Sequence, residues 1–328
     1  MSQTILIYGA TGYTGRLVAM QARVTHLSFE IAGRNGPQVT ALADELGVPC
    51  RIFALDDPET IIASLAGVTA VLNCAVPFAS TARPLMEACI ACGVHYLDIT
   101  AEYKVYAWAE ACSERAAAAG VMLLPGVGWD VVPSDCLAMY LAAKVDQPQS
   151  LRIALQIANS MSRGSTSSVG EILGVGLLVR AEGTIVAKLD AAPARFDFGA
   201  GLVDSVPLSF GDLVTAWKST GIPNIAMFVN IKENVMPEGV AAMPEGPSLD
   251  ERAANRACAV AEVTGIDGAV VRARIETVNG YSYTPLAAVE ALRLVAAGQF
   301  NPGFQTPATV FGASFAVSSA DTRIVDMA

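Results

Sequence analysis

A glycine-rich turn directly after a short apolar strand limits most strongly the folds open to this chain. Residues Thr4–Tyr8 form an apolar run, as expected of a strand buried on both faces of a parallel sheet. The turn Gly9-Ala-Thr-Gly-Tyr-Thr-Gly15 follows, and apolar residues at helical spacing come next. Gly9 permits the sharp turn, Gly12 lets the backbone approach a pyrophosphate, and Gly15 allows close packing of helix on sheet. Because free N–H groups at a helix start bind phosphates, the pattern predicts a dinucleotide site at this junction.

The first part of the chain alternates apolar runs of strand length with segments of helix length. Such alternation predicts a doubly wound parallel sheet, that is, an α/β Rossmann domain whose ligand lies at the carboxyl ends of the strands. We expect strands at residues 4–8, 29–32, 52–55, 70–74, 96–99 and 121–124. We expect helices after the glycine turn and at residues 39–46, 84–92 and 107–119.

The end of the second predicted strand indicates which dinucleotide binds. NAD-binding domains usually have Asp or Glu about 20 residues past the glycines, where the carboxylate bonds the ribose hydroxyls. This chain has Gly33-Arg34-Asn35 there instead. An acidic side chain would repel a ribose 2′-phosphate, whereas the Arg34 guanidinium can bind it through paired, charge-assisted hydrogen bonds. The sequence therefore favours NADP(H), with a solvated loop arginine as the alternative interpretation.

From Leu151 onward the pattern changes to an alternation of apolar and less apolar residues. Residues 151–157 and 271–276 suit strands of an antiparallel or mixed sheet, with one face solvated or packed against a partner. The sequence thus predicts an NADP-binding domain of residues 1–130 and an α+β substrate and dimerisation domain of residues 131–328.

Two later segments have helical periodicity. They cover residues 250–263 and 285–297, with Pro285 suited to a first helical turn and Gly298 to a C-cap. We expect the last helix, about residues 284–298, to pack back onto the first domain.

Several sequence blocks in order resemble the saccharopine dehydrogenase-like oxidoreductases, especially short members that include mycobacterial trans-acting enoyl reductases. The resemblance covers nearly the whole chain and is more specific than any single motif. Its blocks are Gly9-Ala-Thr-Gly-Tyr-Thr-Gly15, Ala32-Gly-Arg34, Leu72-Asn-Cys-Ala75 with Pro77-Phe78, Gly93-Val-His-Tyr-Leu-Asp-Ile-Thr100 with Glu102, Pro125-Gly-Val-Gly-Trp-Asp-Val-Val-Pro-Ser-Asp135, Ser162-Arg-Gly164, Ser219-Thr-Gly-Ile-Pro-Asn-Ile225 and Phe304-Gln-Thr-Pro307. The resemblance implies an NADP(H)-dependent oxidoreductase but no particular substrate, because the chemistries of this group differ.

The glycine turn, the second strand end and the resemblance together give a set of expected cofactor-binding residues. They are Gly9, Thr11, Gly12, Tyr13, Thr14, Gly15, Arg34, Asn35, Cys74, Ala75, Val76 and Pro77. The chain departs from similar sequences where Val76, Ala82 and Ala101 replace expected glycines and Trp129 replaces a phenylalanine. Since a β-branched side chain cannot vacate space as glycine does, Val76 is expected to narrow the approach to the nicotinamide.

A reductase of this fold also needs a proton donor and a group that holds the substrate. Asp98 and Glu102 follow the fifth strand, at the sheet edge where ligands bind, and Asp130 follows the sixth. Burial would raise the pKa of such a carboxyl far enough for a general acid. Arg163 could bind a substrate carboxylate or thioester carbonyl, or could be a surface arginine, and Asp130 could equally be structural. For Asp135 we favour a helix-capping role.

The resemblance implies an NADP(H)-dependent oxidoreductase that transfers hydride to or from a C=N or C=C bond of a small molecule. Imine chemistry predicts a polar pocket with carboxylate-binding arginines, whereas reduction of a carried enoyl group predicts an apolar pocket and a docking surface. The apolar composition of residues 170–179 leans slightly toward a hydrophobic substrate. A protein that binds NADP(H) as a sensor or scaffold, without turnover, is the alternative from another class.

Composition limits the remaining classes. The net charge of −10, with no basic stretch, disfavours nucleic acid and anionic membrane surfaces as partners. The longest charge-free stretch, residues 60–82, contains glycine, asparagine and proline, and no signal-peptide pattern opens the chain, so we expect a cytoplasmic protein without a membrane span. Cys89 and Cys92 suit one turn of a buried helix better than half a zinc centre, so we expect free thiols and no metal. The sheet of the second domain suggests a homodimer.

Overall fold

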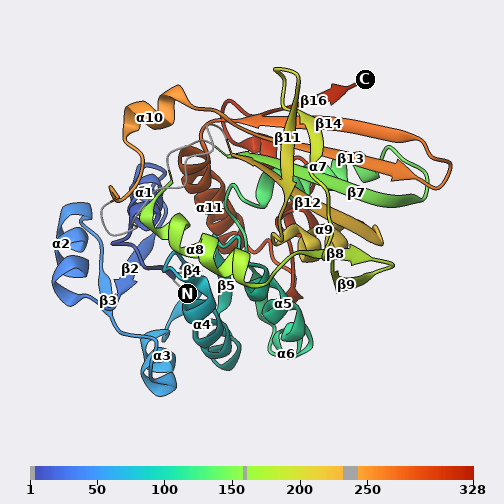
Figure 1. The fold of residues 1–328 in the computed structure, drawn as a ribbon. Coiled ribbons are helices and arrows are strands. Elements are labelled where there is room, and N and C mark those ends of the chain that lie inside the picture. Colours follow the sequence, from blue (N-terminus) through green and yellow to red (C-terminus); the bar gives the residue numbers. More distant parts are fainter. Residues whose placement is uncertain (1–3, 158–160, 232–242) are drawn as a thin grey trace. The chain divides into compact units, whose positions relative to one another are not determined.

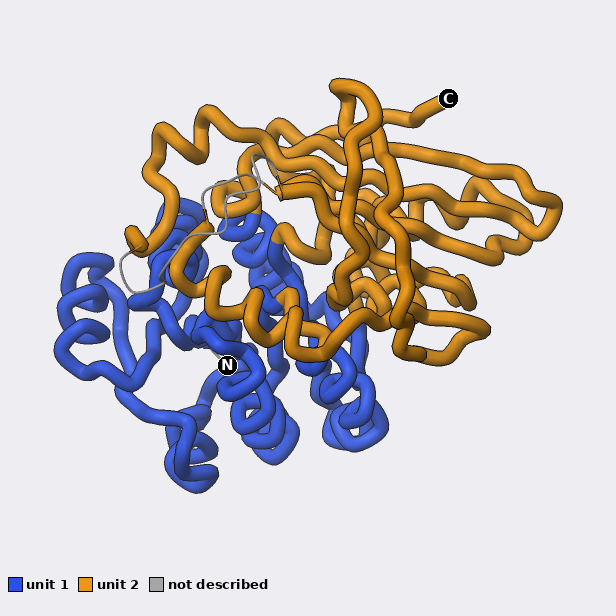
Figure 2. The backbone as a smooth tube through the Cα atoms, viewed as in Figure 1, with its two compact units in different colours: residues 1–100, 104–128, 284–305 blue, residues 101–103, 129–283, 306–328 orange. Residues whose placement is uncertain are grey.

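The chain forms two compact units, and the computed structural model describes residues 4–157, 161–231 and 243–328 (Figure 2). Unit 1 comprises residues 1–100, 104–128 and 284–305. Unit 2 comprises residues 101–103, 129–283 and 306–328. Unit 1 therefore includes the segment of the last long helix, far along the chain from the rest of that unit.

A parallel sheet forms the centre of unit 1 (Figure 1). Its strands, in spatial order, are β15 (Gly303–Phe304), β6 (Met122–Leu124), β5 (His95–Asp98), β4 (Val68–Asn73), β1 (Thr4–Tyr8), β2 (Phe29–Gly33) and β3 (Cys50–Ile52). Every neighbouring pair is parallel. The side chains of Ile5, Leu6 and Ile7 in β1 are completely buried, as expected for a strand covered on both faces. The predicted α/β Rossmann class is therefore confirmed.

Helices join these strands. They are α1 (Tyr13–Val24), α2 (Gly36–Leu46), α3 (Pro58–Ser64), α4 (Phe78–Cys92), α5 (Tyr103–Ala111), α6 (Ser113–Ala118) and most of α11 (Gly280–Ala296). A helix is predicted over residues 84–92, but α4 begins at Phe78 and contains Pro84, whose ring removes one intrahelical hydrogen bond. One predicted helix over residues 107–119 is two, since α5 ends at Ala111 and α6 begins at Ser113, with Cys112 between them.

The strand predicted at residues 52–55 lies instead at Cys50–Ile52, where it pairs with β2. The N–H of Phe53 still donates to the carbonyl of Gly33 in β2 (3.2 Å), and Asp57 then caps α3 by accepting the N–H of Thr60 (3.0 Å). No sequence pattern indicated β15, because a strand of two residues is too short to show a period. Gly303 begins β15 with a positive φ of 88°, where a side chain would be strained.

A mixed sheet forms unit 2. Its strands, in spatial order, are β10 (Ala194–Asp197), β11 (Leu202–Pro207), β12 (Asn224–Ile231), β7 (Pro148–Ile157), β13 (Ala257–Gly265), β14 (Val270–Thr277) and β16 (Arg323–Met327), with the hairpin of β8 (Leu178–Ala181) and β9 (Thr184–Ala187) beside β12. β7 and β12 are parallel, while β13 is antiparallel to both β7 and β14. The predicted α+β class with a mixed sheet is confirmed.

Helices α7 (Val132–Ala142) and α9 (Asp212–Thr220) contact this sheet. The other helices of unit 2 are α8 (Arg163–Gly174), α10 (Leu249–Ala254), α12 (Pro307–Phe311) and a 3-10 helix at Phe315–Ser318. α7 is buried along most of its length because it packs against β7, β13 and β14.

The helix predicted over residues 250–263 is wrong. Only Leu249–Ala254 is helical, and Ala257–Gly265 forms β13 between β7 and β14. Alanine favours helices, but here the two neighbouring strands supply backbone hydrogen bonds on both sides, and Ala259 and Ala261 are completely buried.

Pro285 was expected in the first turn of its helix but lies inside α11, which begins at Gly280. Asn279 explains the earlier start, because its Oδ1 accepts the backbone N–H of Tyr281 (3.0 Å) as an N-cap does.

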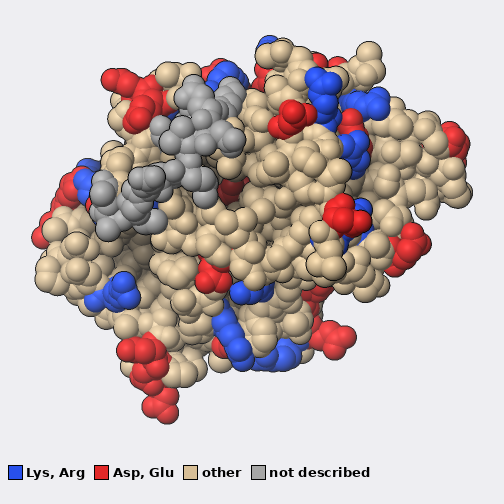
Figure 3. Space-filling model, viewed as in Figure 1, with Lys and Arg blue, Asp and Glu red and all other residues tan. Residues whose placement is uncertain are grey.

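Among the described residues, no helix is both long enough and apolar enough to span a bilayer. On the face shown in Figure 3, acidic and basic side chains occur in small groups among uncharged ones.

Candidate functional site

The glycine-rich turn between β1 and α1 has the geometry of a phosphate cradle. Gly9 has a φ of 80°, and a Cβ placed on it would lie 2.6 Å from the backbone nitrogen of Ala75. A Cβ on Gly15 would lie 2.3 Å from the carbonyl oxygen of Gly9, so both positions exclude any side chain. Gly12 is the N-cap of α1 and has no side chain to cap it, which leaves the helix start available to a bound anion. The residues present therefore fit a dinucleotide pyrophosphate.

The segment Thr11–Thr14, which we predict to bind phosphate, lies at the start of α1. At the end of β2, Arg34 is exposed and makes no ion pair or hydrogen bond with other described residues. Asn35 is the N-cap of α2, and its Oδ1 accepts the N–H of Gln38 (3.3 Å). Arg34 is thus available to a ligand phosphate, whereas the Asn35 side chain has a capping role.

Tyr8 lies beside this strand end. Its hydroxyl donates to the carbonyl of Phe53 (3.2 Å), and the two rings are 5.0 Å apart. Burial raises the pKa of Tyr8, and the positive charge of Arg34 opposes that rise. Arg34 therefore acts electrostatically on the end of β1, the strand that leads into the glycine turn.

The segment after β4 forms the other wall of the turn. Cys74 donates its backbone N–H to the carbonyl of Tyr8 (2.8 Å), and burial raises the pKa of its thiol far above the usual range. Cys74 therefore has a structural role in this wall, through its backbone hydrogen bond and its buried side chain, and does not supply a reactive thiolate. Val76 is 42% exposed, and Pro77 is the N-cap of α4.

Of the candidate catalytic residues, Asp98 lies in unit 1 and is completely buried. Its Oδ1 accepts the backbone N–H groups of Thr100 (3.0 Å) and Gly126 (2.9 Å), and its Oδ2 accepts the hydroxyl of Tyr96 (2.9 Å). Both oxygens are thus occupied by protein donors.

Glu102 and Arg163 lie in unit 2 and have protein partners. Glu102 is 2% exposed and accepts a hydrogen bond from Ser168 of α8 (2.7 Å). Arg163, at the start of α8, forms an ion pair with Glu245 (3.1 Å), and its side chain is 43% exposed. Arg163 is therefore a surface residue of its unit, whereas Glu102 is an interior one.

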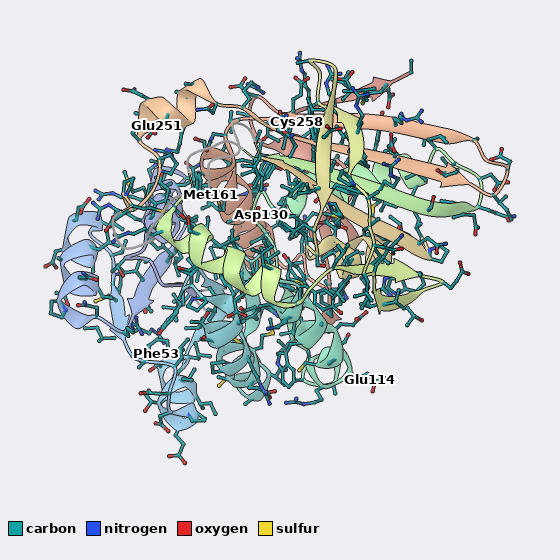
Figure 4. All side chains as sticks on the ribbon, viewed as in Figure 1. Phe53, Glu114, Asp130, Met161, Glu251 and Cys258 are labelled. Carbon is teal, nitrogen blue, oxygen red and sulfur yellow. The ribbon has the colours of Figure 1, made fainter. Side chains whose placement is uncertain are left out.

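Asp130, labelled in Figure 4, follows β6 and precedes α7. Its carboxyl makes no hydrogen bond with the described residues, and burial raises its pKa from 3.8 to about 6. The neighbouring acidic residue Asp212 is completely buried, with neither carboxylate oxygen in hydrogen-bonding geometry, and burial likewise raises its pKa. Asp130 is therefore the candidate best suited to hold a proton near neutral pH.

Tyr281 is a functional candidate that the sequence analysis missed. Its hydroxyl accepts the backbone N–H of Ser162 (2.7 Å) and donates to Oγ of Ser165 (2.8 Å). Burial raises the pKa of Tyr281, and the negative charge of Asp130 adds to that rise. The only sequence signal was indirect, since Ser162 begins one of the blocks shared with similar proteins.

Asp135 has a capping role, as favoured, but for a helix distant in the sequence. Its Oδ2 accepts the N–H of Ala308 in the first turn of α12 (2.9 Å), and its Oδ1 accepts the hydroxyl of Ser219. The carboxylate therefore joins α7, α9 and α12 within unit 2.

The fold and the glycine turn together define a dinucleotide-binding protein of the Rossmann class with an additional α+β unit. Residues 5–124 match the family profile of the saccharopine dehydrogenase NADP binding domain, so the cofactor is NADP(H). The resemblance to saccharopine dehydrogenase-like oxidoreductases is thereby confirmed.

Individual relatives agree with this assignment. A putative trans-acting enoyl reductase of Mycobacterium tuberculosis is 28% identical over 183 residues, which are 52% of this chain and 44% of that protein. A saccharopine dehydrogenase-like oxidoreductase of Bos taurus is 26% identical over 164 residues, 43% of this chain and 38% of that protein. The alignments thus span less than half the length of these relatives.

Among solved structures, apo histidine-tagged saccharopine dehydrogenase (L-Glu forming) from Saccharomyces cerevisiae has a TM-score of 0.64. The match covers 100% of both chains at 12% sequence identity, which shows a shared fold.

Proposed function

We propose that this chain is an NADP(H)-dependent oxidoreductase that transfers hydride to or from a C=N or C=C bond of a small molecule. The observation that carries the proposal is Asp130, whose pKa of about 6 lets it hold a proton in a chain that binds NADP(H). A carboxyl with this pKa is protonated in about a tenth of molecules at pH 7, compared with well under a hundredth at its usual pKa.

The protein groups and the cofactor have separate tasks in this proposal. NADPH, when bound, supplies the hydride that reduces the electrophilic carbon and leaves as NADP⁺. Asp130 supplies the proton that the nitrogen or the second carbon of the reduced bond takes up. Tyr281, whose hydroxyl is fixed by Ser162 and Ser165 and whose pKa the charge of Asp130 helps to raise, orients the group that receives the proton.

The proposal includes two substrate classes, imines and enoyl compounds, which are the two that the resemblance implies. Arg163 would have to exchange its partner Glu245 for a substrate carboxylate, so it supports imine chemistry only weakly. Residues 170–179 do not form a buried apolar helix, since α8 ends at Gly174 and Leu173 is 55% exposed. A homodimer and a cytoplasmic location are also part of the proposal.

The test is NADPH oxidation with a panel of cyclic imines and enoyl thioesters, run for the wild type and Asp130→Asn. We expect turnover with one class, and a loss of about 10²- to 10⁴-fold in the variant at unchanged NADPH affinity. Asp250→Asn, which changes an exposed carboxyl in α10, is the matched control and should keep full activity. Tight NADPH binding without turnover on any member of the panel would favour the sensor or scaffold alternative.

A further inference from the structure

A continuous chain of buried hydrogen bonds joins the ends of β5 and β4 in unit 1. Asp98 accepts three of these bonds, from Thr100, Gly126 and the hydroxyl of Tyr96. The oxygen of Tyr96 in turn accepts a hydrogen bond from Nδ2 of Asn73 (3.2 Å). Because Asn73, Tyr96 and Asp98 are all completely buried, bulk water cannot replace these bonds.

The chain of bonds ends on the backbone of Ala75. Oδ1 of Asn73 accepts the N–H of Ala75 (3.0 Å), and Nδ2 of Asn73 also donates to Oγ1 of Thr81 (3.0 Å). The Thr81 hydroxyl donates to the carbonyl of Ala75 (2.7 Å). Both polar groups of the Ala75 backbone are therefore held by side chains, one from β4 and one from α4.

The carboxylate of Asp98 sets the direction of every bond in this chain. An ionised carboxylate only accepts hydrogen bonds, so the Tyr96 hydroxyl must donate to it and present a lone pair to Asn73. Asn73 must then turn its amide nitrogen toward Tyr96 and its amide oxygen toward Ala75. That orientation is the one that the N–H of Ala75 requires, so the position of Ala75 depends on Asp98 through two intermediate side chains.

Ala75 is a wall of the cofactor cradle. A Cβ on Gly9 would lie 2.6 Å from the nitrogen and 2.8 Å from the Cα of Ala75, so the two backbones are in close contact. A small movement of Ala75 would change the width of the turn that receives the pyrophosphate.

We propose that Asp98 is a positioning residue for NADP(H): acting through Tyr96 and Asn73, it holds Ala75 in the conformation that accepts the cofactor. Asp98 donates no proton to the substrate in this role, and the proposal depends on cofactor binding alone, not on the proposed reaction. Asp98, Tyr96 and Asn73 thus form a relay of hydrogen bonds that ends on Ala75.

The experiment is a double-mutant cycle with NADPH affinity as the readout, measured by nicotinamide fluorescence. Asp98→Asn puts an amide nitrogen, a donor, opposite the Tyr96 hydroxyl. The hydrogen bonds from residue 98 through Tyr96 to Asn73 then reverse direction, and the amide oxygen of Asn73 turns toward Tyr96 and away from Ala75. Tyr96→Phe cuts the relay instead. We expect each variant to weaken NADPH binding by about tenfold, and the double variant to bind no more weakly than the weaker single variant, because both changes act on one path.

Effects that add in the double variant, or an unchanged affinity in both single variants, would overturn the proposal. Tyr283→Phe, which removes a buried hydroxyl that donates to the carbonyl of Ala316 in unit 2, controls for the loss of a buried tyrosine hydroxyl and should leave the affinity unchanged.

A second pair of variants tests the far end of the relay with little risk to folding, since Thr81 is only half-buried. Thr81→Val removes the hydroxyl at nearly constant volume and should weaken NADPH binding by about fivefold. Thr81→Ser keeps the hydroxyl and should restore wild-type affinity. Equal affinities for Thr81→Val and Thr81→Ser would show that the hydroxyl does not position Ala75.

Discussion

The pKa of Asp130 predicts how replacement by asparagine changes stability with pH. A carboxyl whose pKa is raised on folding binds its proton more tightly in the folded state, so unfolding becomes easier as pH rises from 3.8 to about 6. A rise of 2.2 pK units (6 − 3.8) corresponds to about 3 kcal/mol of lost stability above pH 6. This figure is an upper limit, because part of the Asp130 residue remains accessible to solvent.

Asp130→Asn removes the ionisation while keeping the size of the side chain. We expect the variant to have nearly wild-type stability at pH 4 and to be up to about 3 kcal/mol more stable than the wild type at pH 7. The measurement is urea unfolding of both proteins across this pH range, compared as a difference so that Asp135 and Asp212, whose pKa values are also raised, largely cancel. A difference that stays constant between pH 4 and pH 7 would refute the assigned pKa and, with it, the choice of Asp130 as proton donor.

Three further perturbations test the cofactor site and unit 2. Arg34→Ala should remove most of the preference for NADPH over NADH, about tenfold or more in relative Kd, whereas the exposed Arg23→Ala should keep it; both Kd values come from fluorescence titration. Gly15→Ala places a Cβ 2.3 Å from the carbonyl of Gly9 and should abolish detectable NADPH binding, with Gly170→Ala, whose Cβ meets nothing within 4 Å, as a control that binds normally. Thr277→Val removes the acceptor of the Trp129 indole N–H (2.9 Å) and should lower the free energy of unfolding by about 1 to 3 kcal/mol at unchanged NADPH affinity, as measured by denaturant titration.

The parts of the fold that the sequence predicted are those in which local pattern and tertiary environment agree. Thr4–Tyr8 is apolar throughout and lies in the middle of the parallel sheet, so its predicted and observed bounds are identical. Ala257–Gly265 was misjudged because its alanines favour a helix locally, while hydrogen bonding to β7 and β14 makes it a strand. At such a position the helix propensity of alanine contributes less free energy than the interactions with the two neighbouring strands do.

The residues of the candidate site divide in the same way, into those that a local sequence pattern reveals and those that depend on contacts between distant segments. The glycine turn was found because its chemistry lies within seven consecutive residues, Gly9 to Gly15. The hydrogen bonds of Tyr281 with Ser162 and Ser165 join segments more than a hundred residues apart, so no local sequence pattern could predict them. For Asp98, the sequence located the correct sheet edge but could not show that protein donors occupy both oxygens.

The return of residues 284–305 to unit 1 affects how that unit is made in a cell. β15 pairs with β6, and the backbone N–H of Phe304 donates to Oγ of Ser113 (3.0 Å), almost two hundred residues earlier in the chain. A ribosome releases the chain from its N-terminus, so the first six strands of the Rossmann sheet emerge early, but the sheet cannot gain its last strand until residues 303 and 304 have been synthesised. Until then β6 is an unpaired edge in a hydrophobic sheet, a form of the chain that chaperones would recognise and that a fragment ending near residue 130 would retain permanently.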